Sequence, residues 1–295
     1  MSGMEYDLTT ILFSPLSLLP MHARSALVFA FVLSLSLPLP ALAQSWTQHA
    51  PGLAQTTFTI DRETPVGDST LVILRLDPAQ WNPTVLTVRD VGAPYPLTSR
   101  EWVDSTDVPI VTNAGMFATD YRTHVGYLRT ATHVNNSTVN HYKSVAAFRP
   151  LREGLPPFRM FDLDVTPMDT IRARYRSVMQ NLRLIKRPGE NRWGMQDKRW
   201  SEMALAEDQA GNILLVFSRS PYPMAVFNDI LLDLPLDVVA AQHLEGGPEA
   251  QLLVRPPGRD TARVWVGSYE TDFMEDNSNT EVWAIPNALV FTNEH

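Results

Sequence analysis

Short apolar stretches separated by turn residues occupy most of the chain, and they predict strands. The clearest is Thr-Leu-Val-Ile-Leu-Arg-Leu at residues 70–76, which Asp77-Pro78 ends. Residues 201–206 and 213–217 predict a hairpin around the turn sequence Gln209-Ala-Gly-Asn212. Further strands are expected over residues 56–60, 84–89, 108–112, 144–149, 156–165, 181–185, 238–244, 263–267 and 282–290.

One stretch has helical periodicity instead. Four apolar residues recur at the spacing of one face of an amphipathic helix: Phe227, Ile230, Leu231 and Leu234. Pro235 ends this pattern. The helix stands between the strands predicted over 213–217 and 238–244, so we expect a crossover that joins parallel strands.

A shorter helix is predicted over residues 97–103, with Thr98 or Ser99 as its N-cap. Strands still outnumber helices, and no internal repeat or linker divides the chain. The sequence therefore predicts an α+β fold, a single domain of mixed β-sheet with packed helices, over residues 44–295. Residues 1–43 are expected to form a separate N-terminal extension.

Residues 21–43 have the pattern of a secretory signal peptide. An apolar run extends over residues 26–37, and Ala41-Leu-Ala43 has the form of a cleavage site. The apolar run is too short to span a bilayer, and two prolines follow it closely. We therefore predict a mature protein that begins at Gln44, is periplasmic or secreted, and keeps no stable membrane span.

Charge and cysteine content exclude several classes of function. The formal net charge of -8 argues against nucleic-acid binding, which needs a basic surface. The chain has no cysteine, which excludes thiol nucleophiles and cysteine-ligated metals. His133 and His141 lack the compact spacing of a zinc site. The acidic loop 272–276 fits an ordinary solvated loop better than a calcium site. We predict no metal and no cofactor, with a divalent cation as the alternative.

Two apolar strands end at glycine-containing turns that carry polar groups. The first continues into Asn113-Ala-Gly115-Met-Phe117, and the second into Glu245-Gly246-Gly247-Pro248. Asn and Gly both tolerate left-handed backbone, so such turns can present backbone amides to a ligand. Ligands favour the carboxyl ends of strands joined by helical crossovers. We expect the two turns to meet in one site, with Arg122 and His124 following the first turn closely.

Several short motifs, taken in order, resemble the phosphodiester glycosidase family, and above all its exported bacterial branch. They are Val111-Thr-Asn-Ala-Gly-Met-Phe117, Val125-Gly126, Phe148-Arg149-Pro150, Gln180-Asn181 and Leu244-Glu-Gly-Gly-Pro248. The resemblance extends over roughly residues 70–290. It implies the family's fold and a glycosidase activity towards a sugar attached to a phosphodiester.

The family's motifs correspond to individual positions of this sequence. Residues 113–117 match its asparagine-x-glycine-x-phenylalanine turn, and Gln180 matches a glutamine of its central motif. Arg149 stands where the bacterial branch usually has a lysine. Residues 245–247 match an aspartate-glycine-glycine motif, but glutamate replaces the aspartate, and Pro248-Glu249 replaces small hydroxyl residues.

Cleavage of a sugar-1-phosphodiester needs a cation that holds the phosphate and a carboxylate that stabilises an oxocarbenium-like centre or activates water. A phosphate monoester is already a good leaving group, so less acid assistance is needed than in ordinary glycoside hydrolysis. The predicted catalytic residues are Glu245 and Asn113, and Arg149 with Arg122 or Arg219 is the predicted source of the cation. The predicted substrate-binding residues are Gly115, Phe117, Arg122, His124, Arg149, Gln180, Arg219, Gly246 and Gly247.

The sequence thus predicts an exported hydrolase that acts on a carbohydrate or sugar-phosphate ligand of envelope or extracellular glycans. The alternative is a catalytically inactive carbohydrate-binding envelope protein on the same fold, which the glutamate at position 245 motivates. A different hydrolase on this scaffold also stays open, because a fold does not fix a chemistry. The individual residues have structural alternatives too: a tight turn for Asn113 and Gly115, and a satisfied core histidine for His243.

Overall fold

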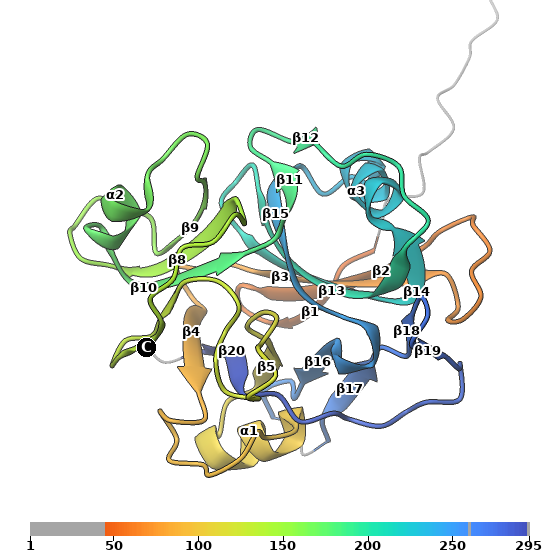
Figure 1. Ribbon diagram of the computed structural model, residues 1–295, viewed down its shortest axis with the longest axis horizontal. Coiled ribbons are helices and arrows are strands. Elements are labelled where there is room, and N and C mark those ends of the chain that lie inside the picture. The colour runs from red at the N-terminus through yellow and green to blue at the C-terminus, as the bar shows by residue number, and fades with distance from the viewer. Residues whose placement is uncertain (1–44, 259–260, 294–295) are drawn as a thin grey trace, which may run out of the picture. The chain divides into compact units, whose positions relative to one another are not determined.

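Three β-sheets form the framework of the chain that the structure describes, residues 45–258 and 261–293 of a computed structural model (Figure 1). The predicted signal peptide lies outside these residues. The largest sheet has the order β1 (Thr47–Ala50), β2 (Leu53–Thr59), β3 (Thr70–Leu76), β14 (Ile213–Pro223), β13 (Arg199–Asp208), β15 (Val238–Gly246), β11 (Arg183–Lys186) and β12 (Glu190–Asn191). Two short strands, β18 (Tyr269–Glu270) and β19 (Met274–Glu275), extend it from β13.

The other two sheets are smaller. The second has the order β7 (Val134–Asn136), β6 (Leu128–Arg129), β10 (Tyr175–Asn181), β8 (Ser144–Pro150) and β9 (Phe158–Asp162). The third has the order β17 (Arg263–Val266), β16 (Gln251–Val254), β5 (Ile110–Asn113), β20 (Asn287–Thr292) and β4 (Asn82–Thr87).

The helices of the described chain are short. They are α1 (Ser99–Thr106), α2 (Met168–Arg172), α3 (Met224–Asp233) and the 3₁₀ turn η1 (Gly247–Glu249). Thr98 is the N-cap of α1, one of the two predicted residues: its hydroxyl accepts from the Glu101 backbone N–H at 3.3 Å, and the Glu101 carboxylate accepts from the Thr98 N–H at 2.8 Å. This reciprocal capping box fixes where the helix begins.

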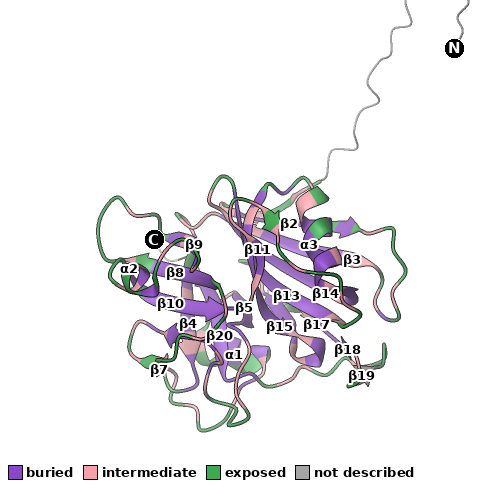
Figure 2. Cartoon of the chain, turned by 45° about the horizontal axis from the view of Figure 1, so that its top comes forward, coloured by how far each residue is buried: buried purple, intermediate pink, exposed green. Residues whose placement is uncertain are grey.

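The large sheet is buried on both faces, as Figure 2 shows for β13, β14 and β15. One face packs against the two smaller sheets in a single apolar cluster that includes Leu74, Met203, Phe148 and Leu252. Because both faces are buried, β13 and β14 do not alternate apolar and polar residues. The pairing of β13 with β14 also continues past residues 218–221, beyond the end of the predicted hairpin.

The other face of the large sheet is covered by α3 (Figure 1). Its residues Phe227, Ile230 and Leu231 are buried in a second cluster, and Leu234 packs at the edge of that cluster. The predicted strand, helix and strand are therefore present in this order, as β14, α3 and β15.

The predicted fold class overstates the share of helix in the structure. Strand β13 lies between β14 and β15 and is antiparallel to both, so the two crossover strands run parallel without pairing. Every strand pairing within the described residues is antiparallel. The α-helices have only eight, five and ten residues, so the fold is mostly β-sheet with minor helices.

Some predicted boundaries differ from the structure. The strand predicted over 282–290 begins only at Asn287, because the preceding backbone is irregular: the Trp283 carbonyl accepts from the Gln251 side chain at 2.7 Å. Strand β16 follows the second glycine turn, and its four residues are too few to predict a strand from the sequence. Helix α2 is too short to show a periodicity in the sequence.

None of the helices in the described part of the chain is long and apolar enough to cross a membrane.

Truncating Ile230 to alanine should lower the free energy of unfolding by about 2–5 kcal/mol, because it leaves a cavity between α3 and the sheet. Ile230 is only 8% exposed. Chemical denaturation measures the loss, and Asp233→Ala, an exposed change on the same helix, is the control. An equally small loss for both variants would show that the buried face of α3 is wrongly assigned.

Candidate functional site

The side chain of Asn113 joins the two glycine turns. Its Nδ2 donates to the Glu249 carbonyl at 3.0 Å, and its Oδ1 accepts from the Gln251 backbone N–H at 2.9 Å. Asn113 ends β5 and is 1% exposed, while Gln251 begins β16, the strand that pairs with β5. The first turn therefore lies directly against the segment that follows the second turn.

Gly115 is required by the close packing of the first turn. Its φ is +150°, and a Cβ atom there would lie 2.2 Å from Asn181 Oδ1 and 2.4 Å from His124 Cε1. Asn181 in turn donates from Nδ2 to the Ala114 carbonyl at 2.8 Å. Any larger residue at position 115 would displace these side chains, so the turn, Asn181 and His124 form one packed unit.

Hydrogen bonds of His124 and Gln180 connect strand β10 to the loops around it. His124 Nε2 lies 2.9 Å from the Gln180 carbonyl, which can only accept, so Nε2 carries the proton. Burial lowers the pKa of His124 to about 4, so this imidazole is neutral. The Gln180 side chain accepts from the Tyr127 N–H at 3.0 Å and donates to the Tyr142 carbonyl at 2.6 Å. These contacts position the loop that carries Tyr142.

Glu245 is a buried carboxyl group at the end of β15. It is 8% exposed, and its Oε1 accepts from the Gly246 backbone N–H at 3.1 Å. Burial raises the pKa of Glu245 to about 8, against the opposing charge of His243. The register of β15 with β13 pairs Met203 with Glu245 and Ala204 with His243, which leaves Leu244 as a bulge residue. Such bulges redirect neighbouring side chains. Because its pKa is about 8, the Glu245 carboxyl group is mainly protonated at neutral pH.

A buried ion pair lies beside Glu245, and the sequence did not reveal it. Glu202 of β13 is fully buried, and its two oxygens lie 2.8 and 2.9 Å from His243 Nδ1. The Trp200 indole N–H donates to the same carboxylate at 2.7 Å. Burial alone would lower the pKa of His243, but the charge of Glu202 outweighs it and raises that pKa. Burial also raises the pKa of Glu202, and the two side chains form one buried hydrogen-bonded pair.

The second turn also needs its glycines. A Cβ atom on Gly246 would lie 2.5 Å from Trp200 Cδ1, and Gly247 has a φ of +63°. Gly267 packs against this turn from the far side, since a Cβ atom there would lie 2.0 Å from the Gly247 carbonyl oxygen. Close contacts with Trp200 and with residue 267 thus fix the backbone of residues 246–247.

Two of the predicted cations and Phe117 lie at the periphery. Arg122 is exposed and donates to the Pro94 carbonyl at 2.5 Å. Phe117 is half-buried, with its ring 5.4 Å from that of Tyr121. Arg149 is exposed at the far end of β8: the antiparallel register places Val145 beside Gln180 and Ser144 beside the strand end at Asn181. The sequence placed Arg149 in the site because it lacked this register.

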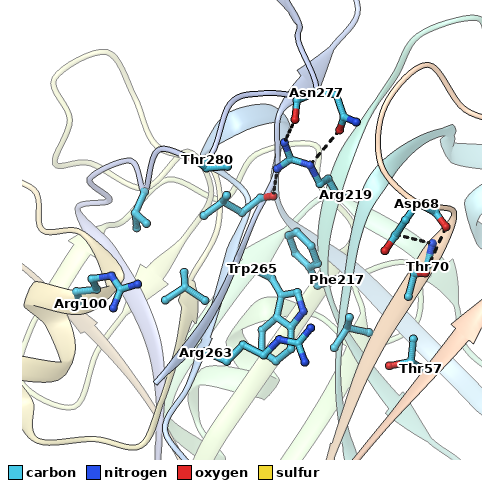
Figure 3. A pocket seen from close by; sticks show the side chains of 14 residues that line it. Thr57, Asp68, Thr70, Arg100, Phe217, Arg219, Arg263, Trp265, Asn277 and Thr280 are labelled. Carbon is cyan, nitrogen blue, oxygen red and sulfur yellow. Dashed lines mark hydrogen bonds between the residues drawn. The ribbon is translucent and has the colours of Figure 1, made fainter. Parts of the chain in front are cut away.

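Arg219 lies in a different cavity, shown in Figure 3. Its guanidinium donates to the carbonyls of Val266 at 2.7 Å, Asn277 at 2.7 Å and Asn279 at 2.6 Å. These bonds occupy most of its N–H groups, so Arg219 fastens two segments of the chain together. The charged partner beside Glu245 is His243 and not one of the predicted arginines.

A groove of ≈ 260 Å³ opens next to the ion pair. Tyr142 lines it, and the pKa of Tyr142 is raised by burial and by the neighbouring Glu245. Leu182 lines it too, and the Leu182 carbonyl accepts from the His243 backbone N–H at 2.9 Å. The remaining lining residues are aromatic or charged: His141, Lys143, Arg183, Arg192 and Trp193, with Gly194.

Metal ions bind where several histidine or acidic side chains converge. Within residues 45–258 and 261–293, no three His, Asp or Glu side chains gather in a way that could ligate one. His133 instead pairs with Asp90 at 3.4 Å, and Asp276 accepts from the Ser278 N–H at 2.8 Å.

The family model for phosphodiester glycosidase matches residues 106–292, and the chain belongs to this family.

Two solved structures share the fold. The catalytic domain of zebrafish N-acetylglucosamine-1-phosphodiester alpha-N-acetylglucosaminidase, auto-inhibited by its pro-peptide, is 15% identical with a TM-score of 0.58, over 85% of this chain and 87% of that one. A hypothetical protein from Synechocystis is 12% identical with a TM-score of 0.51, over 85% of this chain and 64% of that one. No curated protein sequence matches this chain.

Replacing Glu245 by glutamine should stabilise the protein at alkaline pH. Burial raises the pKa of Glu245 from its ordinary 4.5 to about 8, so the folded state holds a proton that the unfolded chain has released. Wild-type stability should therefore fall as pH rises between these values, by up to about 1.4 kcal/mol per pH unit. Glutamine lacks this dependence.

Denaturation of both proteins at about pH 5 and about pH 8 tests this expectation. The advantage of the glutamine variant should grow with pH. A difference that stays constant between the two conditions would show that Glu245 is ionised in the folded protein.

Proposed function

We propose that this protein is an exported hydrolase that cleaves the glycosidic bond of a sugar-1-phosphodiester, or a related bond, in envelope or extracellular glycans. One observation carries the proposal: a buried carboxyl group whose pKa is raised to about 8 adjoins the hydrogen-bonded pair of His243 and Glu202, beside the paired glycine turns of a phosphodiester glycosidase family member. The pattern of a signal peptide over residues 21–43 supports export.

His243 is the cation that receives the anionic leaving group. Its Nδ1–H is directed at Glu202, and Nε2 has no partner in the part of the chain that the structure describes. The side chain is buried, with about 4% of it accessible, and we place the ligand oxygen at Nε2. Glu202 keeps the imidazole protonated, and a charge-assisted bond from Nε2–H to a phosphate oxygen follows. This role replaces that of the predicted arginines.

Glu245 acts as the general acid. The sequence suggested a carboxylate that stabilises positive charge or activates water, but a pKa of about 8 favours the protonated form. Glu245 passes its proton to the bridging oxygen as the bond between that oxygen and the sugar C1 breaks. Water adds its hydroxyl group to C1 and releases a proton, which restores the neutral carboxyl group. The products are a free sugar and a phosphate monoester.

The groove lined by Tyr142 adjoins this centre, since the Leu182 carbonyl in its wall accepts from the His243 N–H. Its aromatic residues, Tyr142 and Trp193, can pack against sugar rings, and Lys143, Arg183 and Arg192 give it several positive charges. Each cation has a carboxylate partner, such as Asp162 at 2.7 Å from Arg183. The groove therefore suits a polar ligand, in keeping with a glycan that carries phosphate.

A non-catalytic carbohydrate-binding protein is the second candidate. The observation that favours it is the glutamate at position 245, which is one methylene longer than the aspartate of the family's motif. A misplacement of about 1 Å at a reacting group can cost about 100-fold in rate. The bulge at Leu244 offers a way to accommodate the longer side chain, which favours the enzyme.

Substitutions at Glu245 and His243 should separate the roles of acid and cation. With a panel of sugar-1-phosphodiesters, Glu245→Gln should abolish release of free sugar, and Glu245→Asp should lower the rate. The wild-type rate should fall as pH rises through about 8, since the acid form is lost. His243→Gln should reduce kcat/KM for phosphodiesters by about tenfold or more, the loss of one charge-assisted hydrogen bond.

The control for these measurements is Glu153→Gln, an exposed carboxylate change that should leave all rates unchanged. If the wild-type protein binds sugar phosphates but never cleaves them, and Glu245→Asp gains activity, the protein is a binding protein and the proposed acid is misassigned.

A further inference from the structure

We propose that the cavity shown in Figure 3 is a second binding site, which takes a saccharide unit that carries a carboxylate or phosphate group. The cavity measures ≈ 460 Å³, within the range of small-ligand sites. None of its lining residues belongs to the centre around Glu245, so the proposal does not depend on the proposed catalytic function.

The cavity forms where two sheets diverge. Strand β17 is an edge strand that pairs with β16, and it lies across from β2, β3 and β14 of the large sheet. Val72 and Phe217 from the large sheet and Trp265 from β17 form an apolar floor that is continuous with the main core cluster. Thr70, Asn277 and Thr280 lie around this floor and offer polar groups.

The wall of the cavity is held by Arg219. Its bonds to the carbonyls of Val266, Asn277 and Asn279 tie β14 to β17 and to the segment before β20. Gly67 adds a bond from the other side, since its N–H donates to Asn277 Oδ1 at 3.0 Å. The cavity therefore has a fixed shape, which lowers the entropic cost of binding.

Two further arginines, Arg100 and Arg263, line the cavity. Arg100 from α1 and Arg263 from β17 are both exposed, and neither side chain has a hydrogen bond or ion pair within the described residues. By contrast, Arg183 and Arg192, which line the groove beside Tyr142, are both paired with carboxylates. In a protein with a net charge of -8, two unpaired guanidinium groups in one cavity favour an anionic ligand.

Arg263 is prepared for such a ligand by its neighbour. Its guanidinium lies over the Trp265 ring, 4.5 Å from the centroid. Stacking on one face leaves the N–H groups at the edge of the guanidinium plane free to bind a carboxylate or phosphate in a bidentate manner. Asp68 also lines the cavity, and its carboxylate can accept from sugar hydroxyls. An anionic sugar matches this combination of cations, acceptor and apolar floor.

Titration of the purified protein with glucuronate, glucose 1-phosphate and neutral glucose tests the proposal. Both anionic sugars should bind at least about tenfold more tightly than glucose, and added salt should weaken them because the guanidinium groups are exposed. Arg100→Ala/Arg263→Ala should reduce the affinity for glucuronate about tenfold or more. The matched control is Arg152→Ala/Arg174→Ala, which removes two exposed arginines outside the cavity.

Glu245→Gln distinguishes this site from the catalytic centre. Binding of glucuronate that survives in Glu245→Gln and is lost in the Arg100/Arg263 variant supports the second site, whether or not the protein proves to be an enzyme. The proposal is overturned if glucuronate does not bind at about 10 mM, a very weak limit for a specific site. It is also overturned if both arginine pairs give the same loss, or if only Glu245→Gln abolishes binding.

Discussion

The two hydrogen bonds of the Asn113 side chain are the constraint on which the site depends. The side chain must donate to the Glu249 carbonyl and accept from the Gln251 N–H at the same time. An amide does both, whereas the carboxylate of an aspartate would accept only, and would face the carbonyl with negative charge. Because Asn113 is buried, loss of either bond would leave a polar backbone group unsatisfied. This explains the residue in structural terms, and its predicted catalytic role stays a prediction.

Buried charge is the second organising feature. Glu202 and His243 are buried together, and the Trp200 indole satisfies a further lone pair of the carboxylate. Removing one partner of such a pair leaves an uncompensated charge in a medium of low dielectric constant. Glu245 lies near the same pair but has no cation of its own, so burial keeps it protonated. Glu202 and Glu245 are thus set apart by their surroundings, because Glu202 is hydrogen-bonded to His243 whereas Glu245 accepts from the Gly246 N–H.

The sequence predicted features that depend on local patterns. The apolar face of α3, the N-cap at Thr98 and the two glycine turns each show in a few neighbouring residues. It missed contacts that depend on strand register. Glu202 and His243 are 41 positions apart and meet only because β13 pairs with β15. Arg149 stands in one of the motifs that match the family, but antiparallel pairing places it at the end of β8 opposite to the end beside Asn181. The clue to Glu202 was a lone carboxylate in an apolar strand, which the sequence alone could not pair.

In the proposed reaction the bond between the sugar and the phosphate breaks on the sugar side, with Glu245 as acid and His243 holding the phosphate. Hydrolysis of a sugar-1-phosphodiester in water enriched in the heavy isotope of oxygen, followed by mass spectrometry of both products, tests which bond breaks. The heavy oxygen should enter the free sugar at C1 and be absent from the phosphate monoester. Heavy oxygen in the phosphate product would show attack at phosphorus, and would contradict the proposed reaction.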